Sequence, residues 1–314
     1  MRIIRTLRGD ISPEKVGAVY YHEHVIARSP VTKAREMDLE LCDVEKMVNE
    51  VRLFKKAGGT LLTDASISDF GENAHLRLEI SEKSGIPIVG TVGFGQKEHH
   101  NEAVKNSTIE ELYEKVMNAA LYGYGQMRLK PGQLKFGTSY GFISESENRC
   151  ARAVARAQKD LKMPLFTHTG IGTMGLSQIA LLKEEGANPE QVCIGHMDRN
   201  PDFWLCRELL KEGVFLGLDQ ISKVKYCTEQ TRIDLICALI RCGYQKRILL
   251  CGDMARQSYL TSFGGGPGFG YILTSFLPRL VRQLMEDGMT ETQAMEIRED
   301  LICRNPKEFL SFEG

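Results

Sequence analysis

The sequence lacks the features that would place the chain in a membrane or on a polyanion. No run approaches the roughly 18 consecutive apolar residues that a membrane-spanning helix requires. Neither sign of charge dominates, because 40 Lys and Arg face 41 Asp and Glu, which gives a formal net charge of −1. A chain this close to neutral has no overall field that would draw it to nucleic acid or to a membrane surface. We therefore expect a small-molecule substrate as its partner.

Paired cysteines are also missing. Nine cysteines are scattered along 314 residues without a C-x-x-C pair, and several lie in apolar runs such as VCIG. Cysteine in such a run behaves as a small hydrophobic residue. The opening MRIIRTLRGD places Arg5, Arg8 and Asp10 where the apolar core of a signal peptide would have to form. We therefore expect the reducing cytosol as the compartment.

The sequence does contain a regular alternation of short apolar runs and longer amphipathic ones. Its 42% hydrophobic and 26% charged residues are typical of a globular protein. The apolar runs predict eight strands, at 18–25, 60–65, 86–94, 133–138, 164–169, 192–198, 214–221 and 247–254. Helical patterns fill the intervals, from Asp43 to Gly58 and at 107–122, 145–161, 175–186, 202–212, 228–243, 271–287 and 291–302.

The order of these elements favours one α/β domain over residues 1–314, built as a (β/α)8 TIM barrel. Strands that are buried on both faces appear as near-continuous apolar runs, as parallel strands do. A doubly wound sheet would share this pattern, but the count of eight favours the barrel. No repeat or linker divides the chain, and the stretches 99–106 and 255–270 are expected to be loop decorations. Barrel enzymes carry their chemistry at the carboxyl ends of the strands.

Four of the seven histidines lie within predicted strands. A polar imidazole inside an apolar strand is costly unless something binds it. His22 and His24 are two residues apart and therefore point to the same face of their strand. His168, His196 and Asp253 lie near the ends of three further strands. Together these five side chains predict a metal site, whereas His75, His99 and His100 are expected at the surface.

Lys135 lies between Leu134 and Phe136 on the fourth predicted strand. A buried ammonium beside two dications would be repelled and would lose its proton. The neutral amine can react with CO2 to form a carbamate, which is anionic and has two oxygens. Such a group can bridge two divalent ions, so we expect a carbamylated Lys135 at a two-metal centre.

Seven separated segments carry a resemblance to a known family. They are YYHEH, LKFGTSYG, FTHTGIGTMG, VCIGHMD, GLDQISK, LLCGDM and RNPKEFLSF. In this order they resemble the phosphotriesterase family of the amidohydrolase superfamily. The phrases TMGLSQIALL, DMARQSY and GGGPGFGYILTSFLPRL are most similar to the subgroup with the phosphotriesterase homology proteins and the phosphorylated-sugar lactonases. Some members of that subgroup carry Glu where this chain retains Lys135, and organophosphate-degrading members carry histidines where it has Gln220 to Lys225.

The resemblance implies two metal positions that share Lys135. His22, His24 and Asp253 would complete one position, and His168 and His196 the other. Zinc is the expected ion, with manganese and cobalt as alternatives, because imidazole and oxygen ligands discriminate little among them. A hydroxide bridging the metals would attack a substrate carbonyl, and Asp253 would carry its proton to the leaving alkoxide. A homodimer is the oligomeric state that the resemblance suggests.

The loops after the last two strands are expected to choose the substrate. Lys223, Lys225, Arg256 and Tyr259 offer three cations and a phenol, and the glycines at 264–268 expose backbone N–H groups. Such loops are a common phosphate site in barrels, and the lactonases of the subgroup bind a sugar phosphate there. We therefore expect hydrolysis of a phosphorylated furanose lactone.

Three alternatives remain open at this stage. The same metal centre could serve a phosphotriesterase-like esterase or an N-acyl amide hydrolase. The segment GTSYG around Ser139 fits the G-x-S-x-G pattern of serine hydrolases, although its partner histidines would be those wanted by the metal site. A barrel that has lost catalysis and only binds its ligand is the third, and it would be expected to lack a metal ligand.

Overall fold

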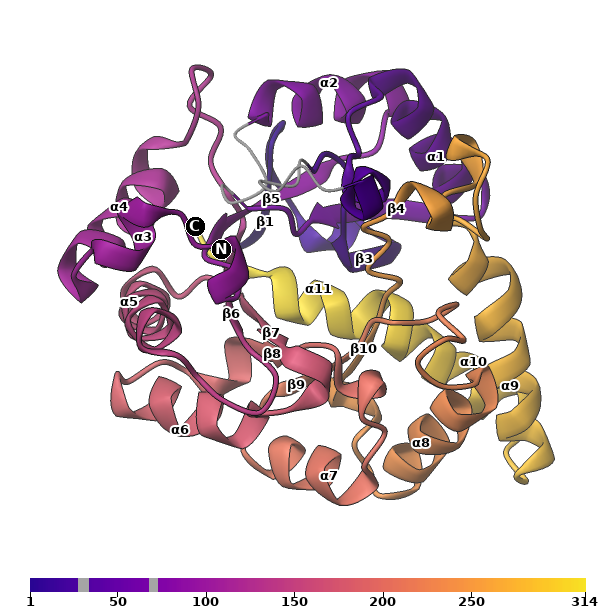
Figure 1. Ribbon diagram of the computed structural model, residues 1–314. Helices are drawn as coiled ribbons and strands as arrows, with labels where there is room; N and C mark the ends of the chain where they lie inside the picture. Colours follow the sequence, from indigo (N-terminus) through magenta and orange to yellow (C-terminus); the bar gives the residue numbers. More distant parts are fainter. Residues whose placement is uncertain (28–33, 68–72) are drawn as a thin grey trace.

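The computed structural model describes residues 1–27, 34–67 and 73–314, and Figure 1 shows a ring of helices around a central barrel. Eight strands follow one another around the barrel in chain order, and every ladder between neighbours is parallel. These strands are β3 (Ala18–Glu23), β4 (Gly59–Asp64), β5 (Ile88–Gly93), β6 (Gln133–Thr138), β7 (Leu165–Thr169), β8 (Val192–Ile194), β9 (Phe215–Leu218) and β10 (Ile248–Leu250). The predicted TIM barrel is confirmed.

Most of the α-helices begin and end near the positions that the sequence predicts. The α-helices are α1 (Val44–Lys56), α2 (Ala74–Ser84), α3 (Glu102–Asn106), α4 (Ile109–Tyr122), α5 (Glu145–Leu161), α6 (Gly175–Glu184), α7 (Phe203–Lys211), α8 (Glu229–Arg241), α9 (Leu277–Glu286), α10 (Glu291–Glu299) and α11 (Asn305–Leu310). Local capping explains several starts: the Asp43 side chain accepts from the backbone N–H of Lys46, and Thr108 and Ser144 each open a capping box.

Several helical segments differ from the prediction, and α2 (Ala74–Ser84) was not predicted. The buried residues of α2 include Arg77, Ser81 and Ser84, so no apolar stripe marks this helix in the sequence. The predicted helix 291–302 ends within a π-helical turn at Asp300–Arg304, which connects α10 to α11, a helix that was not predicted. The stretch 99–106, expected to be a loop, contains the short helix α3.

The N-terminal end of the barrel is closed by elements that the sequence did not predict. A small antiparallel sheet joins β1 (Arg2–Thr6) to β2 (Gly9–Ile11) and β11 (Phe312–Glu313), and Figure 1 shows both chain ends side by side. Helix α11 lies across the barrel, where the ring of Phe309 contacts those of Tyr21 and Phe215 at centroid distances of 6.2 and 5.5 Å. The opposite, carboxyl end of the strands is therefore left for the site.

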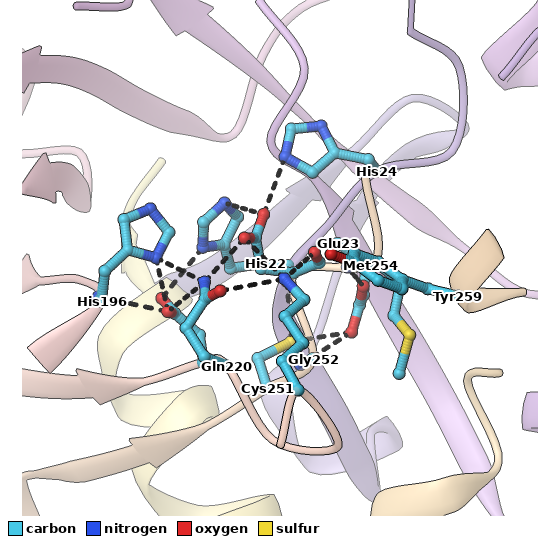
Figure 2. Close-up of polar contacts among 12 residues, drawn as sticks. His22, Glu23, His24, His196, Gln220, Cys251, Gly252, Met254 and Tyr259 are labelled. Carbon is cyan, nitrogen blue, oxygen red and sulfur yellow. Dashed lines mark hydrogen bonds and ion pairs between the residues drawn. The ribbon is translucent and has the colours of Figure 1, made fainter. Parts of the chain in front are cut away.

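The junction between the first and last barrel strands is made by a side chain. No ladder joins β3 to β10 among the residues that the structure describes. Instead the buried carboxylate of Glu23 accepts hydrogen bonds from the backbone N–H groups of Gly252 at 2.9 Å and Met254 at 2.7 Å (Figure 2). Burial raises the pKa of Glu23 to about 8. Glu23 thus fixes the turn that carries Asp253.

Most of the nine cysteines are buried. Within the described ranges, no helix combines the length and the apolar character that crossing a bilayer demands.

Candidate metal centre

All six side chains predicted as metal ligands line one cavity of about 550 Å³ at the carboxyl end of the barrel. They come from β3, β6 and β7 and from the turns that follow β3, β8 and β10, and they are His22, His24, Lys135, His168, His196 and Asp253. Figure 2 shows His22, His24 and His196 turned toward a common centre. Residues as far apart as 22 and 253 therefore meet, as the barrel topology requires.

One group of potential ligands is formed by His22, His24 and Asp253, whose donor atoms lie within 4.8 Å of one another. The Asp253 Oδ1 atom lies 3.1 Å from Nε2 of His24 and 3.6 Å from Nε2 of His22. The His22 Nε2 atom is buried and has no hydrogen-bond partner. Leaving a buried ring nitrogen unsatisfied is costly, so this atom is placed as a metal ligand would be.

A second group is formed around the pair His168 and His196. The His196 Nε2 atom lies 2.8 Å from Nδ1 of His168, and both rings face the cavity. Two ring nitrogens at this distance either share a proton or face a common cation. Main-chain geometry also marks this site, because His196 has φ +61° and Asp253 has φ +46°. Non-glycine residues in this left-handed region are sparse and concentrate at functional sites.

Asp219, which the sequence analysis did not single out, orients two of these imidazoles. Its carboxylate lies 3.0 Å from Nδ1 of His22 and 2.6 Å from Nδ1 of His196. Against the effect of burial, His196 and His22 hold the pKa of Asp219 well below its usual value. A carboxylate on Nδ1 keeps the proton there and leaves Nε2 as the ligand atom. The available signal was an acidic residue directly after the end of β9, in the segment GLDQ.

The protonation states of the site suit a divalent cation. Burial lowers the pKa of His22 to about 3 and also lowers the pKa values of His24 and His168, so these rings are neutral at pH 7. Burial alone would raise the pKa of Asp253, but the Lys223 ammonium and the neighbouring imidazoles hold it well below its usual value. Neutral imidazoles and an ionised carboxylate are the forms that ligate zinc.

Lys135 is a buried residue, 5% exposed, that lines the cavity. Its Nζ donates to the carbonyl of Ala65 at 2.9 Å and lies 5.4 Å from the centroid of the Phe166 ring. Strands β5 and β6 approach each other closely at this point. A Cβ atom on Gly93, which has φ +146°, would lie 1.8 Å from the Lys135 carbonyl oxygen. Glycine at position 93 therefore lets β5 and β6 pair at Lys135.

The four residues predicted to bind substrate take different places. Arg256 lines the cavity, with its Nη1 3.7 Å from Oδ2 of Asp38. Lys223 is buried behind Asp253, with its Nζ 2.9 Å from Oδ2. Lys225 donates to the Tyr259 hydroxyl at 2.5 Å. Tyr259 ends a single 3-10 turn, Gln257–Tyr259, so Arg256 and Tyr259 do not share the face of a longer helix.

The histidines expected at the surface do not all lie there. His75 is exposed, as predicted. His99 is partly exposed and lines the cavity, whereas His100 is buried with its Nε2 2.9 Å from the Gly95 carbonyl oxygen, so the surface prediction is wrong for His100. Sequence reasoning failed here because the polar loop that carries them folds over the strand ends. It also missed Arg199 and Tyr226, which line the same cavity.

The serine-hydrolase alternative loses its geometric basis. The Ser139 hydroxyl donates to the Glu147 carboxylate at 2.6 Å, and Glu147 belongs to the capping box of α5. A nucleophilic serine needs a histidine as its base, and both histidines that follow Ser139 in the chain face the metal cavity. Ser139 therefore has a structural partner.

The chain is similar in sequence to several known proteins. The sequence model of the Phosphotriesterase family matches residues 2–310. A phosphotriesterase homology protein from Escherichia coli is 31% identical over 241 residues, covering 76% of this chain and 79% of that protein. A phospho-furanose lactonase from Mycoplasmopsis synoviae is 28% identical, covering 99% of this chain and 92% of that protein.

Solved structures are similar to this chain in fold. The lactonase Lmo2620 from Listeria monocytogenes superposes with a TM-score of 0.94 at 35% identity, covering 99% of this chain and all of that one. A phosphotriesterase homology protein from Escherichia coli, complexed with phosphate in its active site, superposes with a TM-score of 0.87 at 27% identity. That pair covers 96% of this chain and all of the other.

Proposed function

The chain belongs to the phosphotriesterase family, whose members are metal-dependent hydrolases, and on that premise we propose that it opens the ring of a phosphorylated furanose lactone. The observation that carries the proposal is the cavity in which four imidazoles, Asp253 and Lys135 converge beneath loops that carry Arg256 and Lys225. Lactonases with similar sequences and folds support it.

The residues present fit a two-metal centre. We propose that His22, His24 and Asp253 hold one ion and that His168 and His196 hold the other, with Lys135 shared. The unpartnered Nε2 of His22 and the neutral imidazoles support this assignment. We propose zinc as the native ion. When bound, such ions polarise a carbonyl and supply hydroxide near neutral pH.

Asp253 is suited to move the proton of the attacking water. Its Oδ2 atom accepts from Lys223 at 2.9 Å and from Nε2 of Gln220 at 2.7 Å, which fixes the carboxylate and keeps it ionised. Its Oδ1 atom faces the imidazoles. We propose that Asp253 takes the proton and returns it to the ring oxygen that leaves as an alkoxide.

We propose that Lys135 is carbamylated in the active protein. The neutral amine attacks CO2, a bond forms between Nζ and carbon, and one proton is released to solvent. The product would add a negative charge beside the four imidazoles and the Asp253 carboxylate that line the cavity. It also supplies two oxygens from one side chain, as a shared ligand requires.

We propose that the substrate phosphate is bound near Arg256 and the pair of Lys225 and Tyr259, with Lys223 contributing charge from behind Asp253. The phosphate in the active site of the Escherichia coli relative supports an anion in this type of cavity. We also propose a cytosolic location, which the scattered cysteines without a C-x-x-C pair support.

The proposal is tested with zinc-loaded protein, pentonolactone 5-phosphates and their unphosphorylated analogues. We expect kcat/KM to favour the phosphorylated lactones by about 100-fold or more, since two charged hydrogen bonds are worth about 3 kcal/mol or more. A chelator should abolish turnover, and a serine-directed fluorophosphonate should not. Equal rates on both lactone sets would overturn the phosphate assignment, and full activity in chelator would overturn the metal centre.

A further inference from the structure

A buried polar network of three residues lies beside the turn that carries His24. Asp64 ends β4 and Ser66 follows it, whereas Arg77 lies on α2, in the ring of helices outside the barrel (Figure 1). Each of the three residues is 3% exposed or less. We refer to them as the Arg77–Asp64–Ser66 network. Polar side chains that are buried this deeply need partners, and their partners here lie around His24.

We propose that the Arg77–Asp64–Ser66 network positions His24 as a metal ligand and thereby sets the affinity of one metal position without acting on the other. The Ser66 Oγ atom lies 2.8 Å from Nδ1 of His24. The opposite ring nitrogen, Nε2, lies 3.1 Å from Oδ1 of Asp253, within the first group of potential ligands. A hydroxyl that accepts from Nδ1 leaves Nε2 as the ligand atom. The inference rests on the metal centre proposed above.

Asp64 joins the two turns that meet at His24. Its Oδ1 atom accepts from the backbone N–H of Val25 at 3.2 Å and from the backbone N–H of Ser66 at 3.1 Å. One carboxylate oxygen therefore fixes both the backbone next to His24 and the backbone of the residue that contacts its ring. Hydrogen bonds to an ionised carboxylate are stronger than those between neutral groups, so both turns are held firmly.

Arg77 completes the network from the side of α2. Its Nε is paired with Oδ2 of Asp64, and its Nη2 donates to the carbonyl oxygen of Ile26 at 3.1 Å. The chain directly after His24 is thus held at two successive residues, Val25 and Ile26. A buried ion pair is weak evidence for stability, because the loss of hydration offsets the attraction of the charges. A positioning role explains why the inner face of α2 carries an arginine.

The network differs from Asp219 in the metal position that it serves. Asp219 contacts one imidazole of each group, His22 and His196. The contacts of the network lie around His24, which belongs to the first group. Removing the Ser66 hydroxyl should therefore weaken the ion of the first group and leave the ion of the second group bound. A general loss of stability would weaken both ions.

The test compares Ser66→Ala, Arg77→Met and Arg77→Lys with the control Ser81→Ala. Ser81 is a buried serine on the same face of α2, but its hydroxyl donates to the Ile86 carbonyl oxygen at 2.7 Å and it does not line the cavity. One readout is stepwise zinc binding, measured by competition with a chromophoric chelator. The other is cadmium-113 NMR of the cadmium-loaded protein, in which each bound ion gives its own signal.

We expect the wild type to bind two zinc ions and Ser66→Ala to bind one of them about 10- to 100-fold more weakly, while the affinity for the other changes by less than about threefold. One cadmium signal should shift or broaden, and the other should stay in place. Arg77→Met should give the same pattern. Arg77→Lys should weaken the ion less, because it keeps the charge and loses only the planar fork. Ser81→Ala should bind both ions as the wild type does.

Two results would overturn the proposal. The first is unchanged affinity for both ions in Ser66→Ala. The second is an equal loss of affinity for both ions, which would indicate a general structural effect. Ser66→Ala provides the answer if the Arg77 variants do not fold.

The same measurements separate this proposal from the proposed function. None of them uses a lactone, so a wild type that hydrolyses no lactone refutes the proposed substrate and leaves the role of the network to be decided by metal binding. A wild type that binds fewer than two ions refutes the two-metal centre, and the proposal with it.

Discussion

Replacing Asp219 by Asn tests whether the metal centre is held by its supporting hydrogen bonds. The Asp219 carboxylate contacts Nδ1 of both His22 and His196, at 3.0 and 2.6 Å. An Asn side chain has one acceptor oxygen, so at least one of these contacts becomes donor against donor. A hydrogen bond to a charged group contributes about 1.5–3 kcal/mol, which corresponds to about 10- to 150-fold in a binding constant. Loss of an outer partner of a metal ligand typically costs 10- to 100-fold in affinity.

The assay is competition for zinc between the protein and a chromophoric chelator at pH 7.5. We expect Asp219→Asn to bind zinc about 10- to 100-fold more weakly than the wild type while the metal-free proteins melt within a few degrees of each other. The matched control is Asp202→Asn, because Asp202 caps α7 by accepting from the Leu205 backbone N–H at 3.0 Å and Asn caps equally well. Zinc affinity within threefold of the wild type in a folded Asp219→Asn protein would refute the reasoning.

Three further predictions concern the same centre. In metal-free protein the pKa of His22 is about 3, below the ordinary value of 6.5, so the contribution of His22 to the free energy of unfolding is present above pH 6.5 and is lost as the pH falls. In urea unfolding, the wild type should therefore lose about 2 kcal/mol more than His22→Asn between pH 7.5 and pH 5. Equal losses in the two proteins would contradict this prediction. Glu23→Ala leaves the N–H groups of Gly252 and Met254 unpaired and should lower the free energy of unfolding by about 2–5 kcal/mol in the same assay. A decrease of less than about 1 kcal/mol would show that the β3–β10 junction does not need Glu23. Wild-type protein equilibrated with carbon-13-labelled CO2 should show a carbamate signal in its NMR spectrum that the Lys135→Met variant lacks. Lys135→Met should also retain less than half of the zinc that the wild type binds. Equal spectra and equal zinc content in the two proteins would exclude the carbamate.

The sequence was sufficient for the barrel and for the residues that converge in it. Parallel strands buried on both faces leave continuous apolar runs, so the histidines and Asp253 stood out at the strand ends. Helix α2 did not stand out, because its inner face carries Arg77 beside two serines. The Arg77 guanidinium is paired with Asp64, and this pairing depends on a contact between two elements that no local pattern reveals.

The polar surroundings of the site were harder to predict for the same reason. Asp219 has no apolar periodicity of its own, and its role depends on two histidines that are more than 20 residues away along the chain. Lys223 was expected to face the substrate, but in the folded protein its ammonium lies beneath the Asp253 carboxylate. Residue type and spacing predict which side chains can ligate a metal. Tertiary packing decides which cations remain open to a ligand.

The contact between Glu23 and the turn at Gly252 has a consequence for the order in which the protein matures. His22 and Asp253 come from opposite ends of the chain, and Glu23 joins them only when β10 lies beside β3. During synthesis the first strand leaves the ribosome long before the last one exists. A nascent chain that ends before β10 thus carries imidazoles without their carboxylate, so we expect tight metal uptake to follow translation rather than accompany it.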